Sequence, residues 1–350
     1  MKRCILSGII AIATIFASCT PKVGDSLPRK EPSKKIAAAT ASYIDAVQKA
    51  EQDLHSIMVL QDGKVVFEKW MSEGAPDKPH VLFSVSKTFT ATAVGFAIHE
   101  GLLKLDDKVI SFFPDKLPEV VSDNLKAMNI EHLLTMSCGH TVDPTGTGNR
   151  KVEDWVKHFL AVPVEREPGT LFCYNSMATY MLSAILQKVT GEKVVDYLQP
   201  RLFEPLAIKD ATWQSCPMGI NCGGWGLFLK TEDLAKMGQL FLQEGKWNGK
   251  QVVPQDWIKA ASTFKIDSVP AGHNSDKRAE LLQTMKGSDW LEGYCYQMWR
   301  CRNNAYRADG LLGQYIIVLP EKNAVVVTTA KISDMQAELN LIWEHIYPAL

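Results

Sequence analysis

A serine and a lysine stand three residues apart at the start of a segment with helical periodicity. In Phe83-Ser-Val-Ser-Lys-Thr88, Ser84 and Lys87 would share one face of a helix, with Cβ atoms about 5–6 Å apart. An amine at that distance can take the serine proton if burial lowers its pKa. Free N–H groups at the start of the helix would stabilise an oxyanion. The pair therefore predicts acyl transfer with Ser84 as the nucleophile.

The same spacing occurs a second time, at Ser262 and Lys265. Both residue types are common, and about one chance match is expected in a chain of this length. We interpret the second pair as an ordinary helix end beside a surface lysine. Only the first pair is embedded in further motifs, and these motifs decide between the two.

The residues around Ser84 and those that follow it resemble the class C beta-lactamase-related serine hydrolases. This family includes esterases, D-amino-acid peptidases, oligoamide hydrolases and penicillin-binding relatives. The resemblance covers nearly all of residues 36–347 in the family's order, through His80–Thr90, Glu100–Asp107, Ile130–Met136, Pro168–Tyr174, Gly223–Leu227, Asp233–Gly238 and Gly313-Gln314. It implies a sheet flanked by helices, an acyl-enzyme intermediate, and no metal or organic cofactor.

The resemblance assigns a second motif to Tyr174-Asn-Ser176, which follows Ser84 at the family's spacing. The tyrosine of this motif works with the lysine in proton transfer, and a phenol near an ammonium can lose its proton below its usual pKa of about 10. Ser176 stands where the family has Asn, which alters the expected contact with a substrate amide. A rival motif, Ser122-Asp-Asn124, is interpreted as a turn or helix cap.

A third motif of the family carries a lysine or histidine on the strand beside the site. Aligned on Gly310, the chain has Ala308 at that position and Asp309 after it. The N–H of Leu311 would complete the oxyanion hole with that of Ser84. With the cation missing, a substrate carboxylate has no partner, which weakens a beta-lactamase function. Arg307 has the wrong strand parity to replace it. By this resemblance, the substrate-binding residues are Ser176, Ala308, Asp309 and Gly310.

The elements that must position these residues follow a simple order along the chain. Two β-rich runs surround Asp62-Gly63, a strong hairpin signal. Strands are predicted near the C-terminus at 293–299, 305–308, 314–319 and 324–329. Helices are predicted at 34–53, 88–100, 130–136, 152–159, 177–190, 194–203, 231–243, 255–261 and 332–347. We therefore expect an α+β fold with one antiparallel sheet built from both chain ends.

In this division, residues 34–350 form the hydrolase domain. The sheet lobe comprises about 34–84 and 291–350, and the helical lobe about 85–290. A cleft between the lobes would hold the site.

The N-terminus has the features of an export signal. A cationic start precedes an apolar run from Ile5 to Phe16, and the run ends at Cys19. Residues 1–18 are therefore predicted as a lipoprotein-type signal peptide, Cys19 as the lipid attachment site and residues 19–33 as a tether. Phe16 in place of the more usual Leu leaves plain secretion as the alternative. The protein would face the periplasm or the cell surface, touching the membrane only through its lipid.

Composition limits the remaining possibilities. The 350 residues are 46% hydrophobic and 22% charged with a net charge of −1, which is typical of a globular chain and not of a nucleic-acid-binding one. Six cysteines would remain after processing; their pairing is open, and their spacing does not fit a zinc site.

The prediction is an exported serine hydrolase acting on a small-molecule ester, amide or peptide-like substrate, with an ester preferred. One alternative is a beta-lactamase or D-peptidase acting on cell-wall-like substrates, and another is a sensor that is acylated without turnover. The sequence leaves the oligomeric state open.

Overall fold

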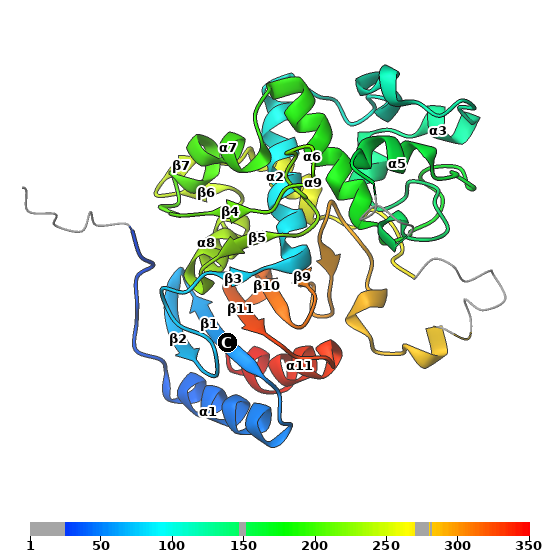
Figure 1. The fold of residues 1–350 in the computed structure, drawn as a ribbon. Helices are drawn as coiled ribbons and strands as arrows, with labels where there is room; N and C mark the ends of the chain where they lie inside the picture. The colour runs from blue at the N-terminus through cyan, green and yellow to red at the C-terminus, as the bar shows by residue number, and fades with distance from the viewer. Residues whose placement is uncertain (1–24, 147–151, 270–279, 281) are drawn as a thin grey trace, which may run out of the picture.

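The structure is a computed structural model that describes residues 25–146, 152–269, 280 and 282–350. Its centre is a six-stranded antiparallel sheet in the order β2-β1-β11-β10-β9-β8 (Figure 1). The strands are β1 (Leu54–Gln61), β2 (Lys64–Trp70), β8 (Trp299–Arg300), β9 (Tyr306–Gly310), β10 (Gln314–Leu319) and β11 (Ala324–Ala330). The N-terminal hairpin thus pairs with the C-terminal strands, as predicted.

The hairpin turn has the backbone that its sequence requires. Asp62 and Gly63 both have positive φ values, 53° and 74°, which is the conformation of a type I′ turn. Strand β1 lies between β2 and β11, so both of its edges are paired, and successive side chains point to opposite faces of the sheet. Ile57 therefore packs into one core and Met58 into the other.

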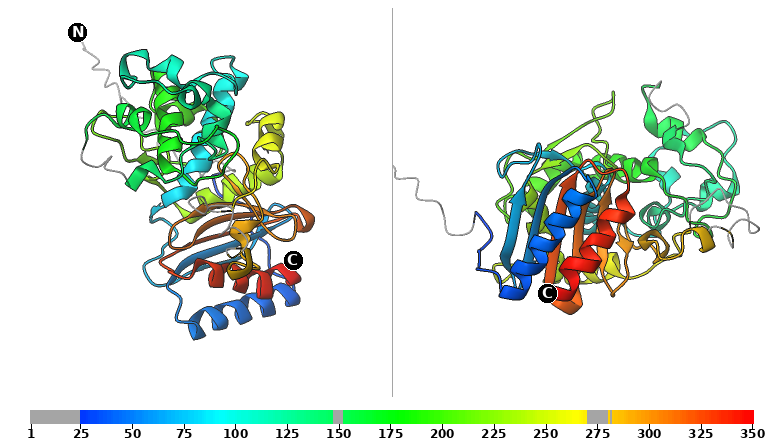
Figure 2. Two further views of the ribbon diagram at one scale, coloured as in Figure 1. Left: turned by 90° about the vertical axis from the view of Figure 1, so that its right-hand side faces the viewer. Right: turned by 90° about the horizontal axis from the view of Figure 1, so that it is seen from below.

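Helices cover both faces of the sheet. On one face lie α1 (Lys34–Lys49), α11 (Met335–Leu341) and a π-helical turn (Ile342–Ile346), with α1 and α11 side by side (Figure 2). On the other face α8 (Thr231–Leu242) packs against β1, β10 and β11. The sequence division assigned α8 to the helical lobe, and the packing assigns it to the sheet.

The helical part surrounds α2 (Ser86–His99), which is buried from Ser86 to Ala97. Buried hydroxyl groups on this helix have partners, because Thr90 donates to the distant Gly223 carbonyl and Thr92 to the Thr88 carbonyl one turn back. The other helices are α3 (Asp123–Ala127), α4 (Ile130–Leu134), α5 (Trp155–Ala161), α6 (Ser176–Thr190), α7 (Val194–Leu198) and α9 (Gln255–Ser262). Short strands β3 (His80–Val81), β5 (Leu227–Leu229) and β4 (Thr212–Trp213) form a second sheet, and β6 (Lys246–Trp247) pairs with β7 (Lys250–Gln251).

Among the predicted elements that differ from the structure, two are instructive. The predicted strand 293–299 is instead a reverse turn, in which the Cys295 N–H donates to the Met298 carbonyl and Tyr294 bridges Trp299. A positive φ of 61° at Gln297 turns the chain there. The predicted helix 332–347 begins only at Met335, because Asp334 caps it by accepting from the Ala337 N–H.

The segment predicted as a tether packs on the body where it is described. The Val65 N–H donates to the Pro28 carbonyl at 2.8 Å, which covers the edge of β2. Leu27 is buried, and Arg29 forms ion pairs with Glu232 at 2.7 Å and Glu68 at 2.9 Å. Residues 1–24, including Cys19, lie outside the described residues.

All six cysteines of the predicted mature chain are buried free thiols in the structure: Cys138, Cys173, Cys216, Cys222, Cys295 and Cys301. Within the described ranges, no helix has the length and apolar character needed to span a bilayer. The same part of the chain contains no group of three or more His, Cys, Asp or Glu side chains that could hold a metal ion.

Candidate active site

Ser84 lies in a tight 3-10 turn (Phe83–Val85) that leads directly into α2. Phe83 has a positive φ of 45°, a conformation that costs a non-glycine residue about 1 kcal/mol. The turn is held by two bonds: the Val85 N–H donates to the Leu82 carbonyl, and the Ser86 hydroxyl donates to that of Phe83 at 2.6 Å. The constrained turn leaves Ser84 partly exposed at the start of the helix.

Lys87 lies one helical turn further on, and its amine is buried. Its Nζ lies 3.0 Å from the Ser84 Oγ, 3.0 Å from the Ser176 Oγ and 2.7 Å from the Gly224 carbonyl oxygen. The side chain is only 1% exposed. Burial lowers the pKa of Lys87 to about 7, although the carboxylates of Asp143 and Asp309 oppose this shift. A large fraction of the molecules therefore carries a neutral amine near neutral pH.

A neutral amine has two N–H donors and one lone pair. Donation to Gly224 and Ser176 uses the two donors. The lone pair then remains for the Ser84 hydroxyl, which is the arrangement needed to remove its proton.

Tyr174 completes the group around Ser84. Its ring centroid lies 5.0 Å from the Lys87 Nζ, and its hydroxyl is hydrogen-bonded to the Ser84 side chain. The ring stacks on Trp299 with centroids 5.5 Å apart. The sequence favoured a lowered pKa for this phenol, and that expectation is wrong, because burial raises the pKa of Tyr174 well above its usual value and the bond to Ser84 opposes this only in part.

Ser176 is the first residue of α6, and Asn175 caps that helix by accepting from the Ala178 N–H at 3.0 Å. The cap fixes the start of α6 so that the Ser176 hydroxyl points at Lys87. Serine in place of the family's asparagine therefore keeps a polar contact with the lysine.

The third predicted motif lies on β9, beside the Ser84 turn. Ala308 is fully buried on the face that packs toward α2. Arg307 and Asp309 occupy the opposite face and pair with each other, Nε to Oδ2 at 2.9 Å. Burial raises the pKa of Asp309 to about 6 in spite of this arginine. The sequence predicted that Asp309 contacts the substrate. In the structure its carboxylate forms an ion pair with Arg307.

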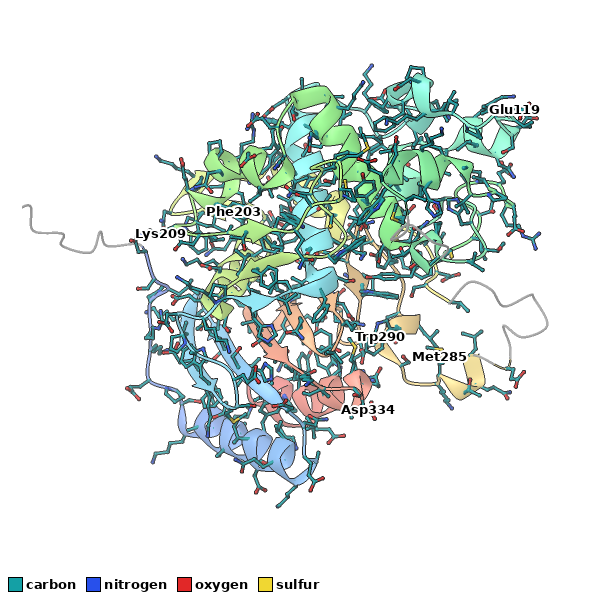
Figure 3. All side chains as sticks on the ribbon, viewed as in Figure 1. Glu119, Phe203, Lys209, Met285, Trp290 and Asp334 are labelled. Atoms are coloured by element: carbon teal, nitrogen blue, oxygen red, sulfur yellow. The ribbon has the colours of Figure 1, made fainter. Side chains whose placement is uncertain are left out.

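Arg307 is the cationic residue next to the position of the missing cation. Its side chain has no exposed surface, and the ring of Trp290, labelled in Figure 3, lies 4.6 Å from its guanidinium carbon. The group is therefore closed off from a substrate. The sequence predicted that Arg307 and Ala308 point to opposite faces of the strand, and the structure places them so.

The end of β9 approaches the Ser84 turn closely. A Cβ atom on Gly310 would lie 2.4 Å from the Leu82 carbonyl oxygen, so only glycine fits. The next residue, Leu311, accepts a hydrogen bond at its carbonyl from the Gln314 Nε2 at 3.0 Å. Leu311 thus directly follows the glycine that meets the Ser84 turn, and its place in an oxyanion hole stays a prediction from the sequence.

The structure also separates the two competing motifs from the site. Ser262 ends α9 and donates its hydroxyl to the Ile258 carbonyl, while Lys265 lies over the ring of Tyr296. Ser122 caps α3 by accepting from the Leu125 N–H. Both sequence interpretations are confirmed.

Several residues of the site were missed by the sequence analysis. Gly224 contributes a backbone carbonyl, and its Gly-Gly-Trp context was noted only as part of the resemblance. Asp143 acts on Lys87 through its charge, and nothing in its loop sequence indicated this. Trp299 also belongs here, because its ring stacks on Tyr174.

The comparison with protein families decides the assignment. The model of the family described as Beta-lactamase matches residues 47–346. The chain belongs to the beta-lactamase family. It is a serine hydrolase of this family, and the resemblance stated from its motifs is confirmed.

Individual relatives agree with the family. The 6-aminohexanoate-dimer hydrolase of Paenarthrobacter ureafaciens is 26% identical over 315 residues, which cover 85% of this chain and 78% of that protein. A penicillin-binding protein homologue from Caulobacter crescentus has a TM-score of 0.72 at 15% identity, covering 92% of this chain and 99% of that one. A family VIII carboxylesterase has a TM-score of 0.67 at 13% identity, with coverages of 92% and 99%. The two solved structures share the predicted fold with this member of the beta-lactamase family.

Proposed function

We propose that this beta-lactamase family hydrolase cleaves a small ester or amide through an acyl-enzyme on Ser84. The observation that carries the proposal is the Lys87 amine, which is buried, has a pKa near 7 and lies 3.0 Å from the Ser84 Oγ. Such an amine is a general base matched to neutral pH. No metal or organic cofactor takes part in the proposed steps.

In the acylation step, the Ser84 oxygen forms a bond to the carbonyl carbon while its proton passes to the Lys87 Nζ. The developing oxyanion is bound by the N–H groups of Ser84 and Leu311. Collapse breaks the bond to the leaving group, which takes a proton from the Tyr174 phenol, and Lys87 returns its proton to Tyr174. The high pKa of the phenol supports this role, because Tyr174 enters the step protonated.

Deacylation follows the same route in reverse. A water molecule attacks the acyl carbon and gives its proton to Lys87, and Ser84 leaves as a restored hydroxyl. The product acid departs, and the enzyme returns to its starting protonation state.

The charges near Ser84 favour substrates without a carboxylate. Ala308 supplies no cation, Arg307 is enclosed and paired, and the carboxylates of Asp143 and Asp309 act on Lys87. A substrate carboxylate bound here would lose its hydration and gain little electrostatic attraction from the protein. Neutral esters are therefore the proposed preference, ahead of beta-lactams or peptides with a free C-terminus.

An amide is the second candidate. The relative from Paenarthrobacter ureafaciens is named as a 6-aminohexanoate-dimer hydrolase and matches most of both chains. Its name supports amide cleavage by this chain, while the carboxylesterase with the same fold supports ester cleavage. The proposed steps accommodate both, because Tyr174 can protonate an amine or an alkoxide.

Export and lipid attachment at Cys19 are part of the proposal on the basis of the N-terminal sequence alone. The cationic start, the apolar run and the small residues before Cys19 support it. The enzyme would then act on substrates outside the cytoplasm.

The test of the nucleophile uses a fluorophosphonate, which labels an activated serine. Ser84→Ala is expected to abolish labelling and to lower ester turnover by several orders of magnitude, because no other group can form the acyl bond. Ser262→Ala, the matched serine of the second motif, is expected to change neither. Loss of labelling in Ser262→Ala instead would show that the assignment is wrong. A single stoichiometric burst without turnover would identify a sensor.

A further inference from the structure

One buried turn is hydrogen-bonded to three helices near the active site, α2, α4 and α6, without touching a reacting group. It is the reverse turn before β8, and Gln297 occupies its tightest position with a φ of 61°. This conformation is costly for a residue other than glycine, so the surrounding contacts must hold it. The side chain is 3% exposed, which places a polar amide inside the core.

The polar atoms of Gln297 are all used. Its Nε2 donates to the carbonyls of Leu133 and Leu134 at 3.0 and 2.9 Å. These are at the C-terminal end of α4, where helical carbonyls lack partners within the helix. The backbone N–H also donates to the Leu134 carbonyl. The amide therefore caps α4 from outside.

The remaining two atoms connect to the helices of the site. The Thr179 hydroxyl donates to the Gln297 Oε1 at 2.5 Å, and the Thr88 hydroxyl donates to the Gln297 carbonyl at 3.1 Å. Thr88 follows Lys87 directly on α2. Thr179 lies about one turn beyond Ser176 on α6. One residue thus connects the helix that carries the amine with the helix that carries its hydrogen-bond partner.

The same turn also positions the aromatic support of the tyrosine. Trp299 lies two residues after Gln297 and stacks on Tyr174, and it pairs with Arg307 across β8 and β9. A displacement of the turn would therefore be transmitted to Tyr174 as well as to α2 and α6.

We propose that Gln297 is a positioning residue, which holds α2 and α6 at the separation that lets the Lys87 amine, already beside Ser84, reach Ser176 and that excludes water from the amine. The inference rests on the proposed function and adds to it a residue that keeps water away from the Lys87 amine. Glutamine is required because one side chain must donate to α4 and accept from α6. Glutamate lacks the donor, and methionine lacks both groups.

The consequence is a specific change in pH dependence. The pKa of Lys87 is low because the amine is buried. If α2 and α6 separate and water enters, the pKa rises toward its ordinary value. The rate of Ser84 acylation would then fall most at low pH, where the amine is protonated, and recover in part at high pH.

The experiment measures the rate of fluorophosphonate labelling at Ser84 against pH in the full chain, together with kcat, KM and Tm for a neutral ester. Gln297→Met is expected to slow labelling roughly 10- to 100-fold at pH 7, with little change in KM. The acid limb of the pH profile, which is the range where the rate falls as the pH is lowered, is expected to move to higher pH. The matched control is Gln239→Met, which removes another buried glutamine amide, on α8. It is expected to lower Tm at most and to leave the pH profile unchanged.

A second pair of variants keeps the test decisive if Gln297→Met does not fold. Thr179→Val removes only the bond to the Gln297 Oε1, and Thr179→Ser retains a hydroxyl at the same place. Thr179→Val is expected to move the acid limb in the same direction, and Thr179→Ser to restore it. A folded Gln297→Met or Thr179→Val protein with a lower Tm but the wild-type rate and pH profile would overturn the positioning role. Failure of the wild type to label at Ser84 would instead overturn the proposed function.

Discussion

At Lys87, the protein lowers the pKa of an amine without placing another cation beside it. The shift comes from burial alone, and the nearby carboxylates of Asp143 and Asp309 limit it. The three oxygen atoms around Nζ hold the amine in place in either charge state, because the Ser84 hydroxyl accepts from the ammonium and donates to the neutral amine. This combination yields a base that is available near pH 7 and still aligned with Ser84.

A pH profile tests this account. Since the neutral amine is the active form, kcat/KM is expected to fall about tenfold for each pH unit below the pKa of Lys87, which is about 7. This pKa sets the position of the acid limb of the profile. Asp143→Asn removes a charge that favours the ammonium, so the limb is expected to move to lower pH. Lys87→Arg is expected to be inactive, because a guanidinium cannot be deprotonated. A flat profile from about pH 5 to 8 would contradict the assignment.

Ala308 determines the second prediction at this scale, which concerns substrate charge. The wild type is expected to cleave a neutral acyl ester with a higher kcat/KM than its carboxylate-bearing analogue, and Ala308→Lys is expected to narrow that preference. Ala308→Met adds similar bulk without charge and is the control, because the position is fully buried. Efficient penicillin hydrolysis by the wild type would show that another cation reaches the site.

At the scale of elements, the site depends on the end of β9 lying against the Ser84 turn. The contact at Gly310 leaves no room for a Cβ atom. The strand end can therefore lie against the turn only while this position is glycine. The preceding residues, Arg307 and Asp309, fix the opposite face of the strand through their ion pair.

Gly310→Ala is expected to lower kcat about 100-fold, since the strand end or the turn must shift by a fraction of an ångström or more. Gly249→Ala is the control. Gly249 has a positive φ of 76° and open space around it, so that variant carries backbone strain of about 1 kcal/mol without a clash. Comparable activity losses in the two variants would mean that strain, and not the approach of β9, is responsible.

At the scale of the whole molecule, the described N-terminal segment belongs to the folded body. Leu27, Pro28 and Arg29 cover the edge of β2 and reach α8. Eight Cα-to-Cα steps lead from Cys19 to Leu27, and a fully extended chain of that length spans about 28 Å. A lipid on Cys19 would therefore hold the enzyme close to the membrane surface.

Cys19→Ser tests the anchor. The variant is expected to leave the membrane fraction for the soluble exported fraction, because no other lipid site is proposed. Ester hydrolysis by the released protein is expected to be unchanged, since the active site lies within the described body. A protein that stays in the membrane fraction would contradict lipid attachment at Cys19.

Local sequence patterns determined the parts of this protein in which neighbouring residues interact. The Asp62-Gly63 hairpin, the strand at 314–319, the cap at Ser122 and the helical Ser84–Lys87 pair follow from backbone preference and spacing. The family motifs identified Tyr174 and Ser176 as well. Periodicity did not predict the turn at Gln297, because its positive φ is maintained by contacts with three helices that are distant in sequence.

The tertiary structure decided the charges and the proton positions. Burial, which depends on the packing of the whole chain, lowers the pKa of Lys87 and raises that of Tyr174, so that their roles differ from those of an exposed pair. The same packing encloses Arg307 with Asp309 and brings the Gly224 carbonyl to the amine. The sequence by itself determined which residues could perform acyl transfer. Only the fold determined which of them is neutral, because desolvation acts through every neighbour in space and not through neighbours in the chain.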